Sequence, residues 1–216
     1  AAYPVLVANG DAESVLKYHP TVVLCADYSR IELVSQLRTA GVRVVVFDRY
    51  VTLEDAYATL RRVADEVGAP QRAAAIIAAC ERRTAALRRR LRGVRPVNVI
   101  APSTYDLVPG DGTTFQDLCD HAGATNLVAS LGHVHGYAPP PSERMLAWPI
   151  DELVLGGTDL DAALAPFRTL PPYAYLSAVK SRRAVLVPPW VLGCVSYRRV
   201  EGYYALARAL HPEAWR

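Results

Sequence analysis

Residues 53–92, LEDAYATLRRVADEVGAPQRAAAIIAACERRTAALRRRLR, decide the fold because they consist almost entirely of residues that favour helices. The one interruption, Gly68-Ala69-Pro70, is typical of a helix that ends and another that begins with proline in its first turn. The second helix is predicted over 70–92, and its expected length is roughly 34 Å. One long helix therefore separates two other regions of the chain.

Short β-branched segments alternate with helical segments on both sides of this long helix. Before it, a short helix is predicted from Asp11, followed by strands over 21–25 and 42–47. The helix between these two strands is predicted over 31–39, with Ser29 as its N-terminal cap. Runs of valine without polar alternation are typical of parallel strands that are covered on both faces.

The same alternation resumes after Gly93. In order, the pattern predicts a strand over 97–101, a helix over 113–121, a helix over 143–148 capped by Ser142, a strand over 152–155, a helix from Asp159, a strand over 184–187 and a helix over 196–210. We therefore predict an α/β fold in which two α/β lobes with mainly parallel sheets are joined by one long helix. The expected boundaries are 1–68 for the N-terminal lobe, 69–93 for the connecting helix and 94–216 for the C-terminal lobe.

Composition and charge exclude several classes of protein. Hydrophobic residues make up 51% of the 216 residues and the formal net charge is +3, so the chain can bury a core and is not intrinsically disordered. No apolar run approaches the ~20 residues that a bilayer-spanning helix needs. The four cysteines lack CxxC spacing, which argues against a structural zinc site and leaves disulfide pairing open.

Neither nucleic-acid binding nor catalysis has support in the sequence. Arginines are concentrated between positions 82 and 92, but no aromatic residues interleave for base stacking, so a solvated helix face is expected and no nucleic-acid partner is assigned. The chain has no GxSxG elbow, no P-loop and no HExxH motif. No catalytic residue is therefore assigned.

Six segments that follow one another over nearly the whole chain carry a family signal. They are DAESVLKYHPTVVL (11–24), LRTAGVRVVVF (37–47), GTTFQDLCDHAGATNLV (112–128), PSERML (141–146), AVKSRRAVLV (178–187) and HPE (211–213). In this order they resemble the substrate-binding proteins of the ABC importers that carry cobalamin, haem and ferric siderophores. Each segment is weak alone, whereas six in the right order are specific. In that family two α/β lobes are joined by one rigid helix.

The resemblance implies a permease as partner and two docking residues. Family members dock through one Glu on each lobe, each of which meets an arginine pocket, and Glu13 and Glu143 occupy the matching positions. A carboxylate in the first turn of a helix is open to solvent, where it can form bidentate pairs with arginine. The alternative is an ordinary acidic residue that stabilises the helix dipole.

The resemblance also implies a ligand between the lobes, at the carboxyl ends of the strands. The loops that follow the predicted strands are rich in aromatic residues, whose flat faces suit a macrocycle or a catechol, and arginine can pair with the carboxylates of such a ligand. Some of the tyrosines are expected only to cover strand ends. The predicted ligand-binding residues are Tyr28, Arg30, Arg49, Tyr50, Tyr105, His133, His135, Tyr137 and Trp190.

The two histidines of this set lie on one glycine-flanked loop, GHVHG at 132–136. In an extended loop, residues i and i+2 point the same way, so His133 and His135 are expected on one side. Solvent-facing histidines are the first interpretation, and one axial ligand to haem or cobalamin is the second. A bare-metal site is disfavoured because further His, Asp or Glu partners are lacking at the strand ends. No resident metal or cofactor is assigned.

The resemblance begins late in the family pattern. Members normally carry a further βα unit before the helix of Glu13, whereas only residues 1–10 precede that helix here. A lobe without this unit is expected to expose a sheet edge and apolar surface. We therefore expect that a rearranged N-terminus or a second copy, in a homodimer, covers the surface.

Taken with the resemblance, these features predict the substrate-binding component of an ABC importer for an iron chelate, haem or cobalamin. The expected location is the periplasm or the cell exterior, with or without a membrane anchor before processing. The alternative is a soluble metal- or chelate-binding protein or sensor of the same fold with no transport role. An α/β enzyme is the least favoured hypothesis.

Overall fold

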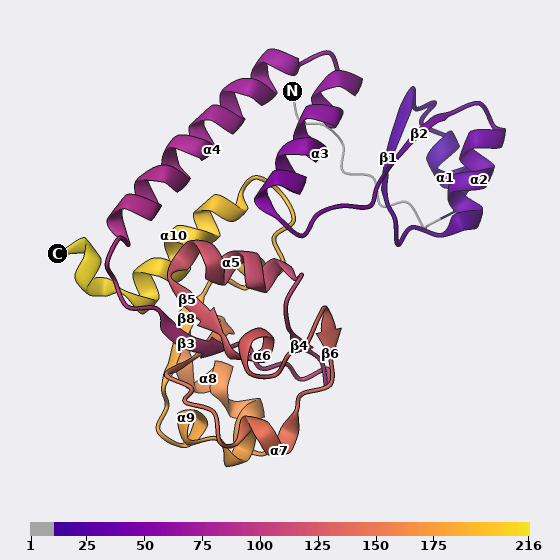
Figure 1. Cartoon of the computed structure of the whole chain (residues 1–216). Coiled ribbons are helices and arrows are strands. Elements are labelled where there is room, and N and C mark those ends of the chain that lie inside the picture. Colours follow the sequence, from indigo (N-terminus) through magenta and orange to yellow (C-terminus); the bar gives the residue numbers. More distant parts are fainter. Residues whose placement is uncertain (1–10) are drawn as a thin grey trace. The chain divides into compact units, whose positions relative to one another are not determined.

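The structure is a computed structural model that describes residues 11–216 (Figure 1). The chain divides into two compact units, 1–49 and 50–216, and both helices of the 53–92 stretch belong to the second unit. The predicted lobe boundaries at 68 and 93 stay a prediction. The expected rearrangement of residues 1–10 lies outside the described residues.

The first unit is a βαβ arrangement preceded by a short helix. Helix α1 (Ala12–Leu16) begins after Asp11, whose carboxylate accepts a hydrogen bond from a backbone N–H of the first turn. Strands β1 (Val22–Ala26) and β2 (Arg43–Phe47) pair in parallel, and helix α2 (Ile31–Thr39) connects them. The elements predicted for this region are thus present within one or two residues of their expected bounds.

Two details of the first unit correct the prediction. Ser29 does not cap α2, because Arg30 occupies the N-cap position and no side chain caps the helix. Within the described part of this unit, residues 11–49, the strands are not covered on both faces, since only Cys25 and Val45 among their residues are buried, and Leu24 is 43% exposed. In this unit α1 and α2 lie on the same side of the two-stranded sheet, so they cover one face only (Figure 1).

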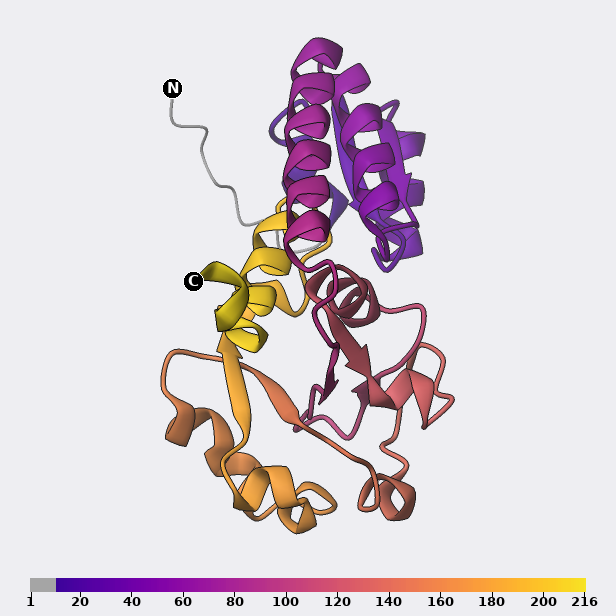
Figure 2. The same ribbon diagram turned by 60° about the vertical axis from the view of Figure 1, so that its left-hand side comes forward.

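The second unit begins with two helices that run side by side, α3 (Leu53–Glu66) and α4 (Pro70–Arg90) (Figure 2). Thr52 and Asp55 form a capping box at the start of α3, in which each side chain accepts a hydrogen bond from the backbone N–H of the other. Pro70 is the first residue of α4, as its fixed backbone angle favours. The predicted long helix is therefore present, and it ends at Arg90.

A four-stranded parallel sheet forms the centre of the second unit. Its strands, in spatial order, are β5 (Ala124–Asn126), β3 (Val97–Ile100), β7 (Glu152–Gly156) and β8 (Ala184–Val187). A separate antiparallel pair is formed by β4 (Val108–Pro109) and β6 (Tyr137–Ala138). The α/β fold with mainly parallel sheets is thus confirmed.

Six further helices connect or follow these strands. They are α5 (Thr114–Ala122), α6 (Leu127–Ser130), α7 (Ser142–Met145), α8 (Leu160–Leu164), α9 (Ser177–Lys180) and α10 (Arg199–Leu210), with single 3-10 turns at Ala165–Arg168, Tyr173–Tyr175, Pro189–Val191 and Pro212–Trp215. Two predictions need correction. Ser142 is the first residue of α7 rather than its cap, since Pro141 occupies the N-cap position and the Ser142 hydroxyl donates to the Pro140 carbonyl. The last helix begins at Arg199, three residues after Ser196.

The central sheet is covered on both faces by separate hydrophobic cores. Val99, Val154 and Val187 pack with α5, α10 and the buried side of α4. Ile100 and Leu153 point to the other face and pack with α7, α8 and α9. Alternate residues of one strand therefore serve different cores, as strand geometry requires.

All four cysteines are free thiols, and they lie in different parts of the fold. Cys119 in α5 and Cys80 in α4 are buried, and burial raises the pKa of both thiols. These two side chains therefore act as small apolar residues of the core.

The C-terminus of α5 depends on a glycine. Gly123 has a φ of 73°, in the left-handed region. Its carbonyl accepts a hydrogen bond of 2.9 Å from Nε2 of the buried His211. A Cβ at this position would lie 2.9 Å from the same nitrogen, so a side chain would push His211 away.

Substitution Gly123→Ala is expected to lower the free energy of unfolding more than Gly93→Ala does. Gly93 has a φ of 79° with nothing within 4 Å of an added Cβ, so both variants carry the left-handed cost of about 1–2 kcal/mol. Only Gly123→Ala adds the clash with His211. Urea denaturation measures the difference, and equal losses would contradict it.

Candidate functional site

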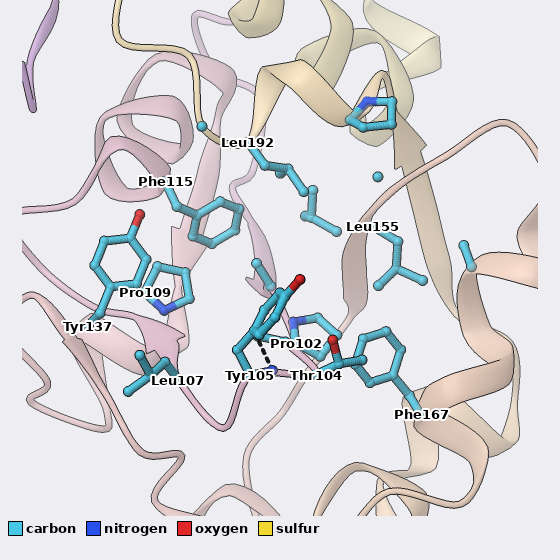
Figure 3. A pocket seen from close by; sticks show the side chains of 17 residues that line it. Pro102, Thr104, Tyr105, Leu107, Pro109, Phe115, Tyr137, Leu155, Phe167 and Leu192 are labelled. Atoms are coloured by element: carbon cyan, nitrogen blue, oxygen red, sulfur yellow. Dashed lines mark hydrogen bonds between the residues drawn. The ribbon is translucent and has the colours of Figure 1, made fainter. Parts of the chain in front are cut away.

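A cavity of about 910 Å³ lies at the carboxyl ends of three parallel strands of the second unit (Figure 3). Residues 101–105, which follow β3, form one part of its wall, and the last residues of β7 form another. Pro189, just after β8, closes a third side. This is the edge at which open α/β sheets bind ligands.

The wall of this cavity is mainly apolar. Its large apolar side chains are Leu107, Pro109, Phe115, Leu155, Phe167 and Leu192. The polar side chains of the wall are hydroxyls, from Ser103, Thr104, Tyr105 and Tyr137, and none of the described lining residues is charged or is a histidine. Figure 3 shows the rings of Tyr105, Phe115 and Tyr137 around the same space. Such a surface suits a flat, largely apolar ligand.

The loop that follows β3 is fixed by a buried tyrosine. The Ser103 backbone N–H donates to the hydroxyl of Tyr173 at 3.4 Å, and the Tyr105 N–H donates to Oγ of Ser103 at 3.1 Å. Tyr173 is 1% exposed and meets the ring of Phe167 edge-on at 5.4 Å. Burial raises the pKa of Tyr173, so its phenol stays neutral.

The part of the wall that contains Pro109 is held by Asn126, which is 2% exposed. Its Nδ2 donates to the carbonyl of Pro109 at 3.0 Å, and its Oδ1 accepts from the Val128 N–H at 3.1 Å. The short strand β4 is thereby held against α6. The next residue must be glycine, because a Cβ on Gly110 would lie 2.1 Å from the Val134 carbonyl oxygen.

Two of the predicted ligand-binding residues line the cavity. Tyr105 is 86% exposed and Tyr137 is 58% exposed, so both rings are open to a ligand. Trp190 does not line the cavity, although its neighbours Pro189 and Leu192 do. Its ring instead lies under the guanidinium of Arg198, 5.5 Å from the ring centroid.

The two loop histidines do not line the cavity. His133 has a φ of 55°, so the loop is not extended there and the expected common direction of i and i+2 does not apply. Nδ1 of His135 lies 3.5 Å from a carboxylate oxygen of Asp111, and both side chains are exposed. Among residues 11–216, no group of three or more His, Cys, Asp or Glu side chains is arranged to hold a metal ion.

The remaining predicted ligand residues lie in or next to the first unit. Tyr28 is 83% exposed in the turn after β1, and Arg30 follows it at the start of α2. Arg49 is exposed at the end of the first unit. Tyr50 is half-buried, and its carbonyl accepts a hydrogen bond from Arg199. A role of these four residues in ligand binding stays a prediction.

The two predicted docking carboxylates are open to solvent in the first turns of their helices. Glu13 in α1 has a side chain that is 86% exposed and lies 3.6 Å from Nζ of Lys17. Glu143 in α7 is exposed, and among the described residues it has no ion-pair partner. Both carboxylates can therefore reach an arginine on another molecule.

The parts of the cavity wall that come from helices and from β4 were not identified from the sequence. Phe115 stands in the first turn of α5 and Phe167 in a 3-10 turn, so helical periodicity assigns both to the core. Pro109 and Leu107 belong to or precede β4, a strand of two residues that has no sequence pattern. Of the missed residues, only Leu192 could have been found from the sequence, because it lies two positions after the predicted ligand residue Trp190.

Residues 7–190 match the model of one protein family, described as periplasmic binding protein. The chain belongs to this family. No curated protein matches this member at a significant level. In the part of the chain that the structure describes, no helix is both long enough and apolar enough to cross a bilayer.

Solved structures of other binding proteins are similar to this family member. The periplasmic heme-binding protein RhuT from Roseiflexus sp. RS-1, in apo form, is 25% identical, with a TM-score of 0.81 over 94% of this chain and 80% of that chain. A periplasmic heme-binding protein from Pseudomonas aeruginosa is 26% identical, with a TM-score of 0.78 over 93% and 75%. An ABC-type Fe3+-hydroxamate transport system from Saccharomonospora viridis, 20% identical with a TM-score of 0.70 over 93% and 72%, shares the fold.

Substitution Tyr173→Phe is expected to loosen the cavity loop without unfolding the protein. It removes only the acceptor of the Ser103 N–H, a hydrogen bond worth about 1 kcal/mol, so amides of 103–105 should exchange with solvent about fivefold faster. Hydrogen exchange read by mass spectrometry measures this. Tyr175→Phe, at an exposed tyrosine outside the lining set, is the control. Unchanged exchange in 103–105 would show that Tyr173 does not hold the loop.

Proposed function

We propose that this periplasmic binding protein is the haem-binding component of an ABC importer. The observation that carries the proposal is the apolar cavity of about 910 Å³ at the strand ends, with two exposed tyrosine rings in its wall. Support comes from two similar structures, at 25% and 26% identity, whose proteins are described as heme-binding. The proposed site of action is the periplasm or the cell exterior.

The uncharged wall supports haem over a ferric siderophore as the proposed ligand. A porphyrin presents two flat apolar faces, which pack favourably on aromatic and aliphatic side chains. A ferric siderophore complex carries charge around its metal, and charge calls for arginine or lysine in the wall, whereas the described lining residues are uncharged. The propionates of haem are its charged groups, and Arg30 and Arg49 are the proposed partners for them.

Tyr105 is the proposed iron ligand. Tyrosinate is an established protein ligand of haem iron, and Tyr105 is the most exposed tyrosine of the cavity wall. The hydrogen bond from its N–H to Ser103 fixes its backbone. Tyr137 is proposed to stack against the ring. Tyr28 and Tyr50 are proposed as further contacts.

Titration with hemin tests the proposal directly. The wild-type protein is expected to shift the visible absorption of hemin and to quench its own tyrosine and tryptophan fluorescence, saturating at a defined stoichiometry. Parallel titrations with cyanocobalamin and with ferric hydroxamate and catecholate siderophores serve as the comparison. Tight binding of one of these, without binding of hemin, would assign a different chelate to the cavity.

Substitution Tyr105→Phe is expected to remove the phenolate-to-iron charge-transfer band and to weaken hemin binding about tenfold or more, because a metal ligand is lost. Tyr175→Phe is the matched control, since Tyr175 is 61% exposed and lies outside the lining set. If Tyr105→Phe leaves the spectrum unchanged and Tyr28→Phe alters it, the iron ligand belongs to the first unit.

Docking through Glu13 and Glu143 is the second part of the proposal. Charge reversal, Glu13→Arg or Glu143→Arg, is expected to abolish stimulation of the ATPase of the cognate reconstituted permease while hemin binding stays unchanged, because like charges then face each other. Glu32→Arg, at an exposed acid in the first turn of α2, is the control. Hemin binding with no permease response in the wild type would favour a carrier or sensor over a transport role.

A further inference from the structure

A buried arginine of α10 joins two backbone segments that are far apart in the sequence. Arg199 is 3% exposed and uses four of its five N–H donors. Nη1 donates to the Val51 carbonyl at 2.6 Å and to Asp117 Oδ2 at 2.8 Å. Nη2 donates to the carbonyl of Tyr50 at 2.8 Å and to that of Cys194 at 2.9 Å. One guanidinium group thus holds three backbone carbonyls.

Asp117 of α5 completes the arrangement from the opposite side. It is 8% exposed, and its Oδ1 accepts a hydrogen bond from the Leu53 N–H at 3.3 Å. Its Oδ2 also accepts from the hydroxyl of Tyr203 at 2.5 Å. The ring of His121 stacks on Tyr203 with 4.2 Å between centroids. The segment 50–53 is therefore held at Tyr50 and Val51 by Arg199 and at Leu53 by Asp117.

The two segments held by Arg199 have different roles. Residues 50–53 are the first residues of the second unit and directly follow the first unit along the chain. Cys194 directly follows Leu192 and Gly193, which line the cavity. The carbonyl of Leu192 accepts a hydrogen bond from the Thr114 hydroxyl at 3.3 Å, so the cavity rim is also tied to α5. Arg199 is thus the direct physical link between the cavity rim and the start of the second unit.

A buried ion pair of this kind is better explained by positioning than by stability. Removing two charges from water costs about as much as the pair regains, so apolar residues of equal volume often serve stability as well. Only a guanidinium group offers a planar fork that reaches several carbonyls and a carboxylate at once. Lysine offers three donors and no fork, and therefore cannot replace the four bonds of Arg199.

We propose that Arg199 is a positioning residue that couples the cavity rim at 192–194 to the segment 50–53, so that the two segments move together. A ligand that contacts Leu192 or Gly193 shifts the Cys194 carbonyl, and Arg199 passes this shift to Tyr50 and Val51. The ligand-dependent part of this inference rests on the proposed haem-binding function. The ligand-free coupling of the two segments does not.

Amide hydrogen exchange in the Arg199→Lys variant tests the coupling without ligand. Exchange is expected to become about tenfold faster in both 50–55 and 191–196, because hydrogen bonds to a charged group are lost. Amides of α4 and of the central sheet are expected to stay at the wild-type rate, whereas a general loss of stability would accelerate all of them. Arg208→Lys, at an exposed arginine of the same helix, is the matched control.

Hemin then tests whether ligand binding at the cavity rim changes the segment 50–53 through Arg199. In the wild type, hemin is expected to slow exchange in both segments, and in Arg199→Lys it is expected to slow 191–196 alone. Faster exchange in only one segment, or in neither, of ligand-free Arg199→Lys overturns the proposal. Hemin protection of 191–196 without protection of 50–55 in the wild type also overturns it. If hemin does not bind the wild type, the proposed function fails and the ligand-free comparison still decides the coupling.

If Arg199→Lys does not fold, the same exchange measurement is made on Tyr203→Phe. This variant retains Arg199 and removes only the hydroxyl that donates to Asp117. A smaller acceleration of exchange, confined to the same two segments, is expected. Wild-type exchange rates in both segments would contradict the coupling.

Discussion

The parallel pairing of β3, β7 and β8 is the constraint on which the rest of the second unit depends. Parallel strands cannot be joined by tight turns, so each connection must cross a face of the sheet before the next strand begins. These crossings carry α5 on one face and α7, α8 and α9 on the other, and α4 and α10, before and after the sheet, complete the first core. The same pairing brings the carboxyl ends of all three strands to one edge. The cavity is therefore a consequence of strand direction, and its side chains only adjust its chemistry.

The fold is largely predictable from the sequence because its main elements are long or strongly patterned. The helix formers between positions 53 and 92 leave one break, and the strand at 184–187 coincides with the predicted one. The elements that were missed, such as β4 and β6, have two residues each and therefore no periodicity. Cap positions were wrong at Ser29 and Ser142 because capping depends on backbone angles, which composition does not determine.

The site is predictable only in the loops that follow the strands. Tyr105 was identified in this way, whereas Phe115 was not, because a residue in a helical pattern gives no sign that one edge of its ring faces a cavity. The GHVHG pattern predicts an extended loop, but His133 has a φ of 55°, so the local backbone overrides the pattern. The burial of Arg199 is the feature that the sequence predicts least well. Its partner Asp117 is 82 positions away, and sequence reasoning places an isolated arginine at the surface.

The four free thiols differ in how open they are to oxidants. Oxidants and soft metal ions react with the thiolate form, and Cys80 and Cys119 are kept in the thiol form by the low polarity around them. Burial therefore passivates these sulfurs without crosslinking the chain. Cys194, which is only partly covered, is where redox damage would begin. Cys194 belongs to the cavity rim, so oxidation would change the mouth of the cavity before it reached the core.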